Sequence, residues 1–354
     1  MIDNWIIRII LFPFTILYWI IIQIRNLLYE TGLLRSVSFD VPVISVGNLN
    51  TGGTGKTPMI EYLIRQLQPF IQVGVLSRGY KRKTKGYRNV QPQDPYTKVG
   101  DEPLQIKKKY PAAAVAVGED RSLAIPQLLQ NYEDVQLVLL DDAFQHRAVT
   151  PYFHILLTEY GNLFTRDYLL PMGRLREPRR NAARADIVVV TKCPSDLSED
   201  EKKKIREEIK PASDQHLFFS TLRYHTAYNV FDTTERVLPD GKTIFLLTGI
   251  ANPDSIARFV KKRSRDYFHR RFPDHYAFRK HDVANVIDTY EKMEGEDKMF
   301  LTTEKDLIRL EPHFHYFMRK DIDLFALPIE VEFLDDEQGG FTDLVKDKLL
   351  KFKV

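Results

Sequence analysis

The sequence predicts an α/β protein with two domains, the first an α/β/α layered domain around a parallel sheet. Apolar runs rich in β-branched residues alternate with segments of helical periodicity over residues 43–220. A polar, turn-rich stretch at 221–240 ends in Pro239-Asp240-Gly241, and a second strand and helix series follows. We expect an N-terminal apolar helix at 1–35, the first domain at 36–222, a linker strand at 223–240, a smaller α/β domain at 241–322, and a return strand with a C-terminal helix at 323–354.

Composition excludes several classes of protein. The 354 residues include 51 basic and 48 acidic side chains, a net charge of +3. Charge so evenly balanced gives no support for a nucleic-acid partner, and none is predicted. The single cysteine, Cys193, excludes an internal disulfide and a zinc site built from cysteines.

The strongest local signal lies between residues 41 and 67. A β-branched run at 41–46 predicts a buried strand, a glycine-rich turn follows it, and apolar residues at helical spacing begin at Met59. This order is typical of a P-loop, where backbone N–H groups and the helix N-terminus bind nucleotide phosphates. The lysine of the loop reaches the phosphates, and the threonine hydroxyl binds Mg²⁺. The predicted phosphate-binding residues are Asn50, Thr51, Gly52, Gly53, Thr54, Gly55, Lys56 and Thr57.

A pair of carboxylates ends a later strand. Four apolar residues run into Asp141 and Asp142, the layout in which a P-loop protein holds Mg²⁺ through an aspartate at a strand end. Gln145 and His146 follow at the carboxyl end of the same strand, where ligands bind in open α/β sheets. We predict that these residues face the phosphates. The sequence does not distinguish which of Asp141 and Asp142 lies nearer the metal.

Several charged residues have two interpretations from sequence alone. Four arginines between 174 and 180 could bind phosphates or form ordinary surface pairs. The basic loop 81–85 suits anionic lipid headgroups, a phosphorylated substrate or plain solvent equally. Asp101 begins a helix, where an acid stabilises the helix dipole, and His275 lies in an aromatic loop, where histidine is usually structural.

The nucleotide base is predicted from the strand that ends in Thr191-Lys192-Cys193-Pro194. GTP-binding P-loop proteins commonly have an Asn/Thr-Lys-x-Asp motif at such a strand end. Because Pro194 replaces the aspartate that would accept hydrogen bonds from guanine, the sequence favours ATP.

The N-terminus is unusually apolar. Residues 9–22 form a charge-free run of 14 residues, shorter than the roughly 20 that a spanning helix requires, and Pro13 would kink it. Three alternatives remain, in order of preference: a helix lying in the membrane interface, a tilted spanning helix, and a core helix of a soluble protein.

Taken together, these landmarks resemble the tetraacyldisaccharide 4′-kinases of lipid A biosynthesis. Asn50 stands where the strict P-loop pattern has glycine, and the family also lacks glycine there. The matching segments, in the order of the family, are Gly47-Asn48-Leu49 through Gly-Gly-Thr-Gly-Lys-Thr-Pro, Ser77-Arg78-Gly79-Tyr80, Gly100-Asp101-Glu102-Pro103, Asp141-Asp142-Ala143-Phe144-Gln145-His146-Arg147, Leu175-Arg176-Glu177-Pro178, Asp274-His275 and Thr303-Glu304-Lys305-Asp306.

The resemblance implies transfer of the γ-phosphate of ATP, with Mg²⁺, to the 4′-hydroxyl of a tetraacyldisaccharide 1-phosphate. It implies Asp101 as the base and His275 as its partner from the second domain. It also places Arg176 and Glu177 near the phosphates and Mg²⁺, and Arg78, Gln145 and His146 near substrate or phosphate. The implied partners are the lipid substrate and the cytoplasmic face of the bacterial inner membrane, with no obligate protein partner. The first alternative is a membrane-associated regulatory P-loop ATPase that phosphorylates no small molecule. The second is a nucleotide-binding module that acts as a scaffold with negligible turnover.

Overall fold

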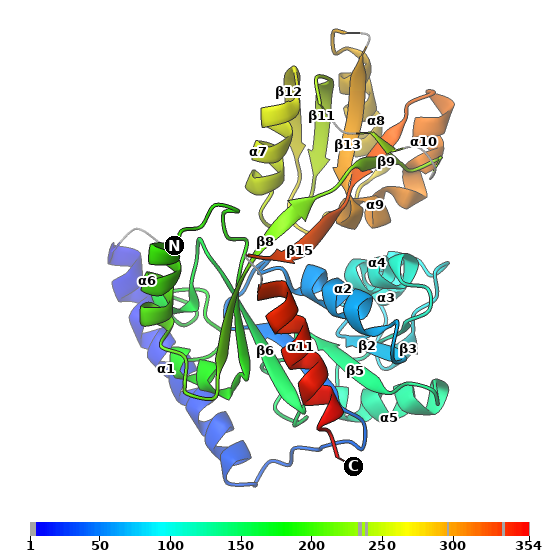
Figure 1. Ribbon diagram of the computed structural model, residues 1–354. Helices are drawn as coiled ribbons and strands as arrows, with labels where there is room; N and C mark the ends of the chain where they lie inside the picture. The colour runs from blue at the N-terminus through cyan, green and yellow to red at the C-terminus, as the bar shows by residue number, and fades with distance from the viewer. Residues whose placement is uncertain (1–4, 233–235, 238–239, 296, 335–336, 354) are drawn as a thin grey trace.

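The computed structural model describes residues 5–232, 236–237, 240–295, 297–334 and 337–353, and has two domains joined by a pair of strands (Figure 1). The first domain is built around a nine-stranded sheet and the second around a six-stranded sheet. The predicted turn residue Pro239 lies outside the described residues.

The first sheet has the order β15-β8-β7-β6-β1-β5-β2-β4-β3. Its central strands are parallel, and only the edge pairs β3–β4 and β15–β8 are antiparallel. The strands are β1 (Val43–Asn48), β2 (Val73–Ser77), β3 (Arg88–Asn89), β4 (Ala114–Val117), β5 (Leu137–Asp141), β6 (Phe153–Glu159), β7 (Ile187–Thr191), β8 (His216–Tyr224) and β15 (Ile329–Phe333).

Helices cover both faces of this sheet, which explains why its strands are apolar on both sides. Alternate residues of β1 enter opposite cores: Ile44 packs with the helices α2 (Lys56–Leu67), α4 (Asp101–Lys109) and α11 (Glu337–Leu350), and Val43 packs with α5 (Arg121–Asn131). The remaining helical segments of this domain are α3 (Tyr96–Val99), η1 (Phe164–Arg166), η2 (Arg179–Arg184) and α6 (Glu199–Ile209).

The second sheet has the order β10-β9-β14-β13-β11-β12, and a core rich in phenylalanine lies on one face. Its strands are β9 (Ala227–Asn229), β10 (Arg236–Val237), β11 (Thr243–Thr248), β12 (Asp266–Arg271), β13 (Lys298–Thr303) and β14 (Leu324–Leu327). Its helices are α7 (Asp254–Arg263), α8 (Lys280–Glu291), α9 (Glu304–Leu310), η3 (Glu311–His313) and α10 (Phe314–Arg319).

The two domains are linked by chain segments that run in opposite directions (Figure 1). The chain leaves the first sheet through β8, enters the second at β9, and returns through β14 and β15. The return strand expected within 323–354 is two strands and not one, because Pro328 divides it into β14 in the second sheet and β15 in the first. Proline lacks the N–H that a continuous strand would need there, so the change of sheet occurs at that residue.

The N-terminal helix α1 (Trp5–Glu30) lies along one flank of the first domain (Figure 1) and continues through Pro13. By length and composition it is long and apolar enough to cross a membrane. Its side toward the protein is partly polar and buries Thr15, Ile22 and Asn26, whereas Ile9 and Ile10 are each 61% exposed. A surface helix of a soluble protein buries its apolar side and exposes its polar side, and α1 does the opposite. A core helix would bury its large apolar side chains, so that alternative does not fit either.

Candidate active site

The glycine-rich loop after β1 is tightly held by its neighbours. Just before the loop, a side chain at Gly47 in β1 would bring its Cβ within 2.6 Å of the Cβ of Phe144, so only glycine fits there. Gly55 caps α2 in the left-handed conformation, with φ 87°. Lys192 Nζ donates to the carbonyl of Gly53 at 2.5 Å, and Thr191 Oγ1 donates to that of Thr54 at 2.9 Å. Thr191 at the end of β7 and Lys192 after it therefore hold the loop between β1 and α2 in place.

The two acidic residues after β5 lie beside this loop because β5 pairs with β1, with Asp141 opposite Val46. Asp141 is 2% exposed and accepts a hydrogen bond from Ser77 Oγ at 3.1 Å. Burial, with the charges of Glu102 and Asp142, raises the pKa of Asp141 to about 7. The Asp141 carboxyl is therefore protonated more readily than an ordinary aspartate.

Asp142 is held by cations. Arg176 donates to both of its carboxylate oxygens, at 2.8 and 3.2 Å, and Lys56 Nζ lies 3.7 Å from Oδ1. Burial alone would raise the pKa of Asp142, but Lys56 and Arg176 outweigh it and lower the pKa to about 2. Lys56 and Arg176 therefore favour the ionised form of Asp142.

The oxygen set here fits a magnesium ion that is shared with nucleotide phosphates. Asp141 Oδ1 is buried without a hydrogen-bond partner, which leaves a lone pair available. Among the described residues there is no cluster of three or more His, Cys, Asp or Glu side chains that could hold a metal. Because Mg²⁺ commonly takes one or two carboxylates plus phosphate oxygens and waters, Thr57, Asp141 and Asp142 suffice for such a site.

Glu177, predicted beside the metal, forms ion pairs with two arginines through its carboxylate. It is fully buried, and its two oxygens lie 2.5 Å from Arg25 of α1 and 2.5 Å from Arg184. Asn181 Nδ2 donates to it at 3.2 Å. The structure therefore brings Arg176 to the phosphate loop but turns its neighbour Glu177 toward the N-terminal helix.

Asp101 and His275 meet across the two domains. Asp101 is the first residue of α4, and His275 lies in the loop after β12 with φ 56°. Asp101 Oδ2 lies 2.7 Å from His275 Nδ1. Burial alone would raise the pKa of Asp101, but the hydrogen bond from His275 and the charge of Lys305 outweigh it and lower the pKa to about 2. This pair is the contact expected of a carboxylate base with a partner histidine.

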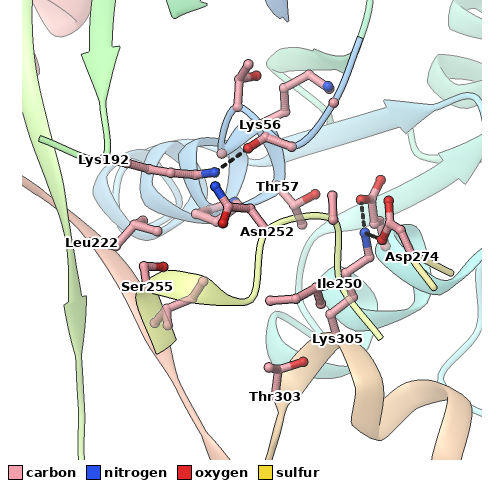
Figure 2. Close-up of a pocket in the computed structure, with 18 of the residues that line it drawn as sticks. Lys56, Thr57, Lys192, Leu222, Ile250, Asn252, Ser255, Asp274, Thr303 and Lys305 are labelled. Atoms are coloured by element: carbon pink, nitrogen blue, oxygen red, sulfur yellow. Dashed lines mark hydrogen bonds and ion pairs between the residues drawn. The ribbon is translucent and has the colours of Figure 1, made fainter. Parts of the chain in front are cut away.

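A cleft of about 400 Å³ opens between the P-loop and the second domain. Lys56 and Thr57 line one wall, and Ile250, Thr303 and Lys305 of the second domain line the other (Figure 2). Leu222, from β8, belongs to the lining as well. His275 also lines it, whereas Asp101 lies behind that ring and is 5% exposed.

The sequence and the structure both match known proteins. A sequence profile of the family described as "Tetraacyldisaccharide-1-P 4'-kinase" matches residues 7–350. The chain belongs to this family. It is 43% identical to a tetraacyldisaccharide 4'-kinase of Bacteroides thetaiotaomicron, over 94% of this chain and 90% of the relative. It is 41% identical to that of Flavobacterium johnsoniae, over 94% and 95%.

A solved structure agrees with these relatives. The crystal structure described as the "apo" form of LpxK from Aquifex aeolicus in complex with ATP matches with a TM-score of 0.72 and 30% identity. The match covers 97% of this chain and 99% of that one. The α/β fold and the apolar N-terminal helix thus belong to a whole-length family architecture.

The remaining predicted residues of this family member lie at the carboxyl ends of the same strands. Gln145 Nε2 donates to the carbonyl of Asn48 at 2.9 Å, so this residue supports the loop. His146 Nε2 accepts from the backbone N–H of Arg121 at 3.2 Å, and burial, with the charge of Arg121, lowers its pKa. Arg78 is exposed after β2. None of these three is among the residues lining the cleft.

Sequence reasoning missed two cations beside Asp101. Lys305 Nζ lies 2.8 Å from Glu102 Oε1 and 3.3 Å from His275 Nε2, and Arg309 lies 3.7 Å from Asp101 Oδ2. The charges of Glu102, Asp101 and Asp274 raise the pKa of Lys305 although burial opposes them. The Thr303-Glu304-Lys305-Asp306 motif was the one available signal for this group.

Proposed function

We propose that this chain transfers the γ-phosphate of ATP to the 4′-hydroxyl of a tetraacyldisaccharide 1-phosphate. The observation that carries the proposal is the hydrogen bond between Asp101 and His275, beside a cleft whose facing wall is the P-loop. A kinase needs a group that accepts the proton of the attacking hydroxyl, and a simple ATPase switch does not need one from a second domain. Family membership supports the same acceptor.

ATP is the favoured nucleotide. The relative from Aquifex aeolicus is described in complex with ATP, and Pro194 stands where a guanine-binding motif would have aspartate. The lining of the cleft includes Leu222, Ile250 and Leu327, which are apolar. An apolar wall suits a planar base, and we infer that the adenine lies against these residues.

The reacting phosphoryl group would be bound by charge and by backbone N–H groups. The loop amides, Lys56 and Arg176 balance the negative charge that spreads over the transferring phosphate oxygens. We propose that Thr57, Asp141 and Asp142 hold Mg²⁺, which supplies further charge neutralisation on the β- and γ-phosphates.

Proton removal is assigned to the interdomain pair. The 4′-oxygen forms a bond to the γ-phosphorus as the bond to the β-γ bridging oxygen breaks, and ADP leaves. Because His275 lines the cleft and Asp101 lies behind it, His275 can pass the hydroxyl proton to Asp101. A carboxylate of low pKa serves here because in a loose transition state the hydroxyl loses its proton late.

The membrane assignment rests on α1. Its large apolar side chains face away from the protein, as a helix inserted in a lipid interface requires. An acylated acceptor lies in a membrane and ATP is available on its cytoplasmic side, so we propose the cytoplasmic face of the inner membrane. The partners are then the lipid substrate and the membrane surface, with no protein partner needed.

The proposal is tested by incubating the full chain with γ-labelled ATP and detergent-dispersed tetraacyldisaccharide 1-phosphate. Label should appear in the lipid with the wild-type chain and not with Lys56→Met, which removes the phosphate-binding amine. Release of free labelled phosphate with unlabelled lipid would favour the regulatory ATPase.

A further inference from the structure

The side of α1 that faces the protein makes polar contacts with the first domain, with Gln23 bonded to Arg180, Glu30 paired with Arg147, and three further residues bonded to a single short segment. Tyr18 Oη donates to the backbone carbonyl of Arg176 at 2.8 Å, and Arg25 pairs with Glu177 at 2.5 Å. One turn of helix earlier, Thr15 Oγ1 accepts from the backbone N–H of Met172 at 3.3 Å. The last three contacts fall within residues 172–177, so one part of the attachment of α1 lies where this segment passes the P-loop.

The opposite side of the same segment holds the P-loop. The N–H of Arg176 donates to the carbonyl of Leu49 at 2.7 Å, and the N–H of Thr51 donates to the carbonyl of Arg174 at 2.7 Å. The residue at 176 is therefore fixed at its N–H by the loop and at its carbonyl by Tyr18. Its guanidinium can then reach both oxygens of Asp142 and the carbonyl of Asn48.

Glu177 makes this attachment specific. A fully buried carboxylate needs paired charges, and here one of its two cations comes from α1. A helix that served only to tether the protein to lipid would need no buried ion pair with the residue next to a phosphate ligand. We propose that Tyr18 and Arg25 are positioning residues that hold Arg176 in the phosphate site, so that α1 is part of the catalytic assembly. This inference rests on the proposed kinase function.

Tyr18→Phe removes the hydroxyl and keeps the ring. Tyr152→Phe is a matched control, because Tyr152 Oη also donates to a backbone carbonyl at 2.8 Å, that of Lys348 at the C-terminal helix. Measured in detergent, where anchoring to vesicles is not needed, kcat of Tyr18→Phe should fall by about tenfold. The KM for lipid should stay near that of the control, since the lost contact acts on the transferring phosphate.

Arg25 supplies a second, independent series. Arg25→Lys keeps a cation for Glu177 and Arg25→Met does not, so kcat should follow the order wild type, Lys, Met. Amide hydrogen exchange over residues 170–177 should quicken in Tyr18→Phe and Arg25→Met but not in Tyr152→Phe. This exchange readout does not depend on the kinase reaction.

The outcomes distinguish a failure of the positioning role from a failure of the proposed kinase function. A Tyr18→Phe enzyme with the kcat of Tyr152→Phe, or an Arg25→Met enzyme with the kcat of Arg25→Lys, overturns the positioning role. A loss confined to the lipid KM overturns it as well, because the helix would then only bind lipid. If the wild type labels no lipid, the proposed function fails, and unchanged exchange at 170–177 would separately refute the attachment.

Discussion

Asp101 Oδ2 and His275 Nδ1 lie 2.7 Å apart although 174 positions separate the two residues in the chain. One belongs to the helix α4 beside the P-loop and the other to the second domain. A hydrogen bond of this length requires contact between α4 and the loop after β12, so moving the two domains apart would break it. We therefore expect the proposed proton-accepting pair to form when the domains come together around substrate, by a movement about β8 and β15.

Asp101→Asn should lower kcat by about 10²–10⁴-fold, because the amide cannot accept the hydroxyl proton. ATP affinity should change little, since Asp101 does not line the cleft. Steady-state kinetics in detergent provide the measurement. Asp288→Asn is the control: this exposed residue of α8 pairs only with Lys292 among the contacts described. Wild-type turnover by Asp101→Asn would remove Asp101 as the base.

Lys56→Met should abolish turnover while the protein remains folded. The amine lies 3.4 Å from Asn48 Oδ1 and 3.7 Å from Asp142, where it can reach a bound phosphate, and nothing replaces its charge. Circular dichroism and product formation are measured together. Lys320→Met, which removes an exposed ion pair with Glu291, should keep normal activity. A folded and active Lys56→Met enzyme would contradict the P-loop assignment.

The stability of the protein should depend on the protonation of Glu61 in α2. Lys109 of α4 lies 2.8 Å both from Glu61 Oε2 and from Glu304 Oε2 of the second domain. Burial, opposed by Lys109 and aided by Glu304, raises the pKa of Glu61 from 4.5 to about 6. Between these values the folded state binds more protons than the unfolded state, so the free energy of unfolding falls as pH rises through this window.

Urea unfolding of wild type and Glu61→Gln over about pH 4 to 7 measures this effect. The stability of the wild type relative to Glu61→Gln should decrease by about 2 kcal/mol between low and high pH. Glu291→Gln, at an exposed ion pair, is the control. A constant difference between wild type and Glu61→Gln across the range would show that the glutamate does not titrate in this window.

The outward face of α1 should carry membrane binding. Replacing Ile9, Ile10 and Leu17 together by serine should strongly reduce flotation with vesicles, because each side chain is more than half exposed and apolar. Leu123→Ser alters an equally exposed leucine on α5 and should float like wild type. Undiminished flotation of the triple variant at high salt would place the membrane contact on another surface.

Local patterns predicted the parts of the site that one stretch of chain can build. The strand β1, the glycine-rich turn and α2 are contiguous, and Asp141 ends an apolar run that pairs with β1. The pairing of Asp101 with His275 had no such signal in the residues themselves. Only the resemblance to a kinase family suggested it, because contact between domains leaves no mark in local spacing.

Long-range contacts are the part of the site that local patterns do not reveal. Only the family resemblance suggested Glu177 near the metal. In the structure Arg25 and Arg184 pair with its carboxylate, because adjacent side chains can point to opposite sides of an extended segment. The sequence of α1 also gave no sign of what its polar residues would contact. Their partners lie about 150 positions away, as the 152-residue separation of Arg25 and Glu177 shows.

The position of the transferred phosphate tests the central claim most directly. The lipid product made by the wild-type chain from ATP and tetraacyldisaccharide 1-phosphate would be purified and analysed by ³¹P NMR with proton correlation. We predict a second phosphomonoester coupled to the proton at the 4′-carbon. A diphosphate at the 1-position, or free phosphate with unchanged lipid, would contradict the account.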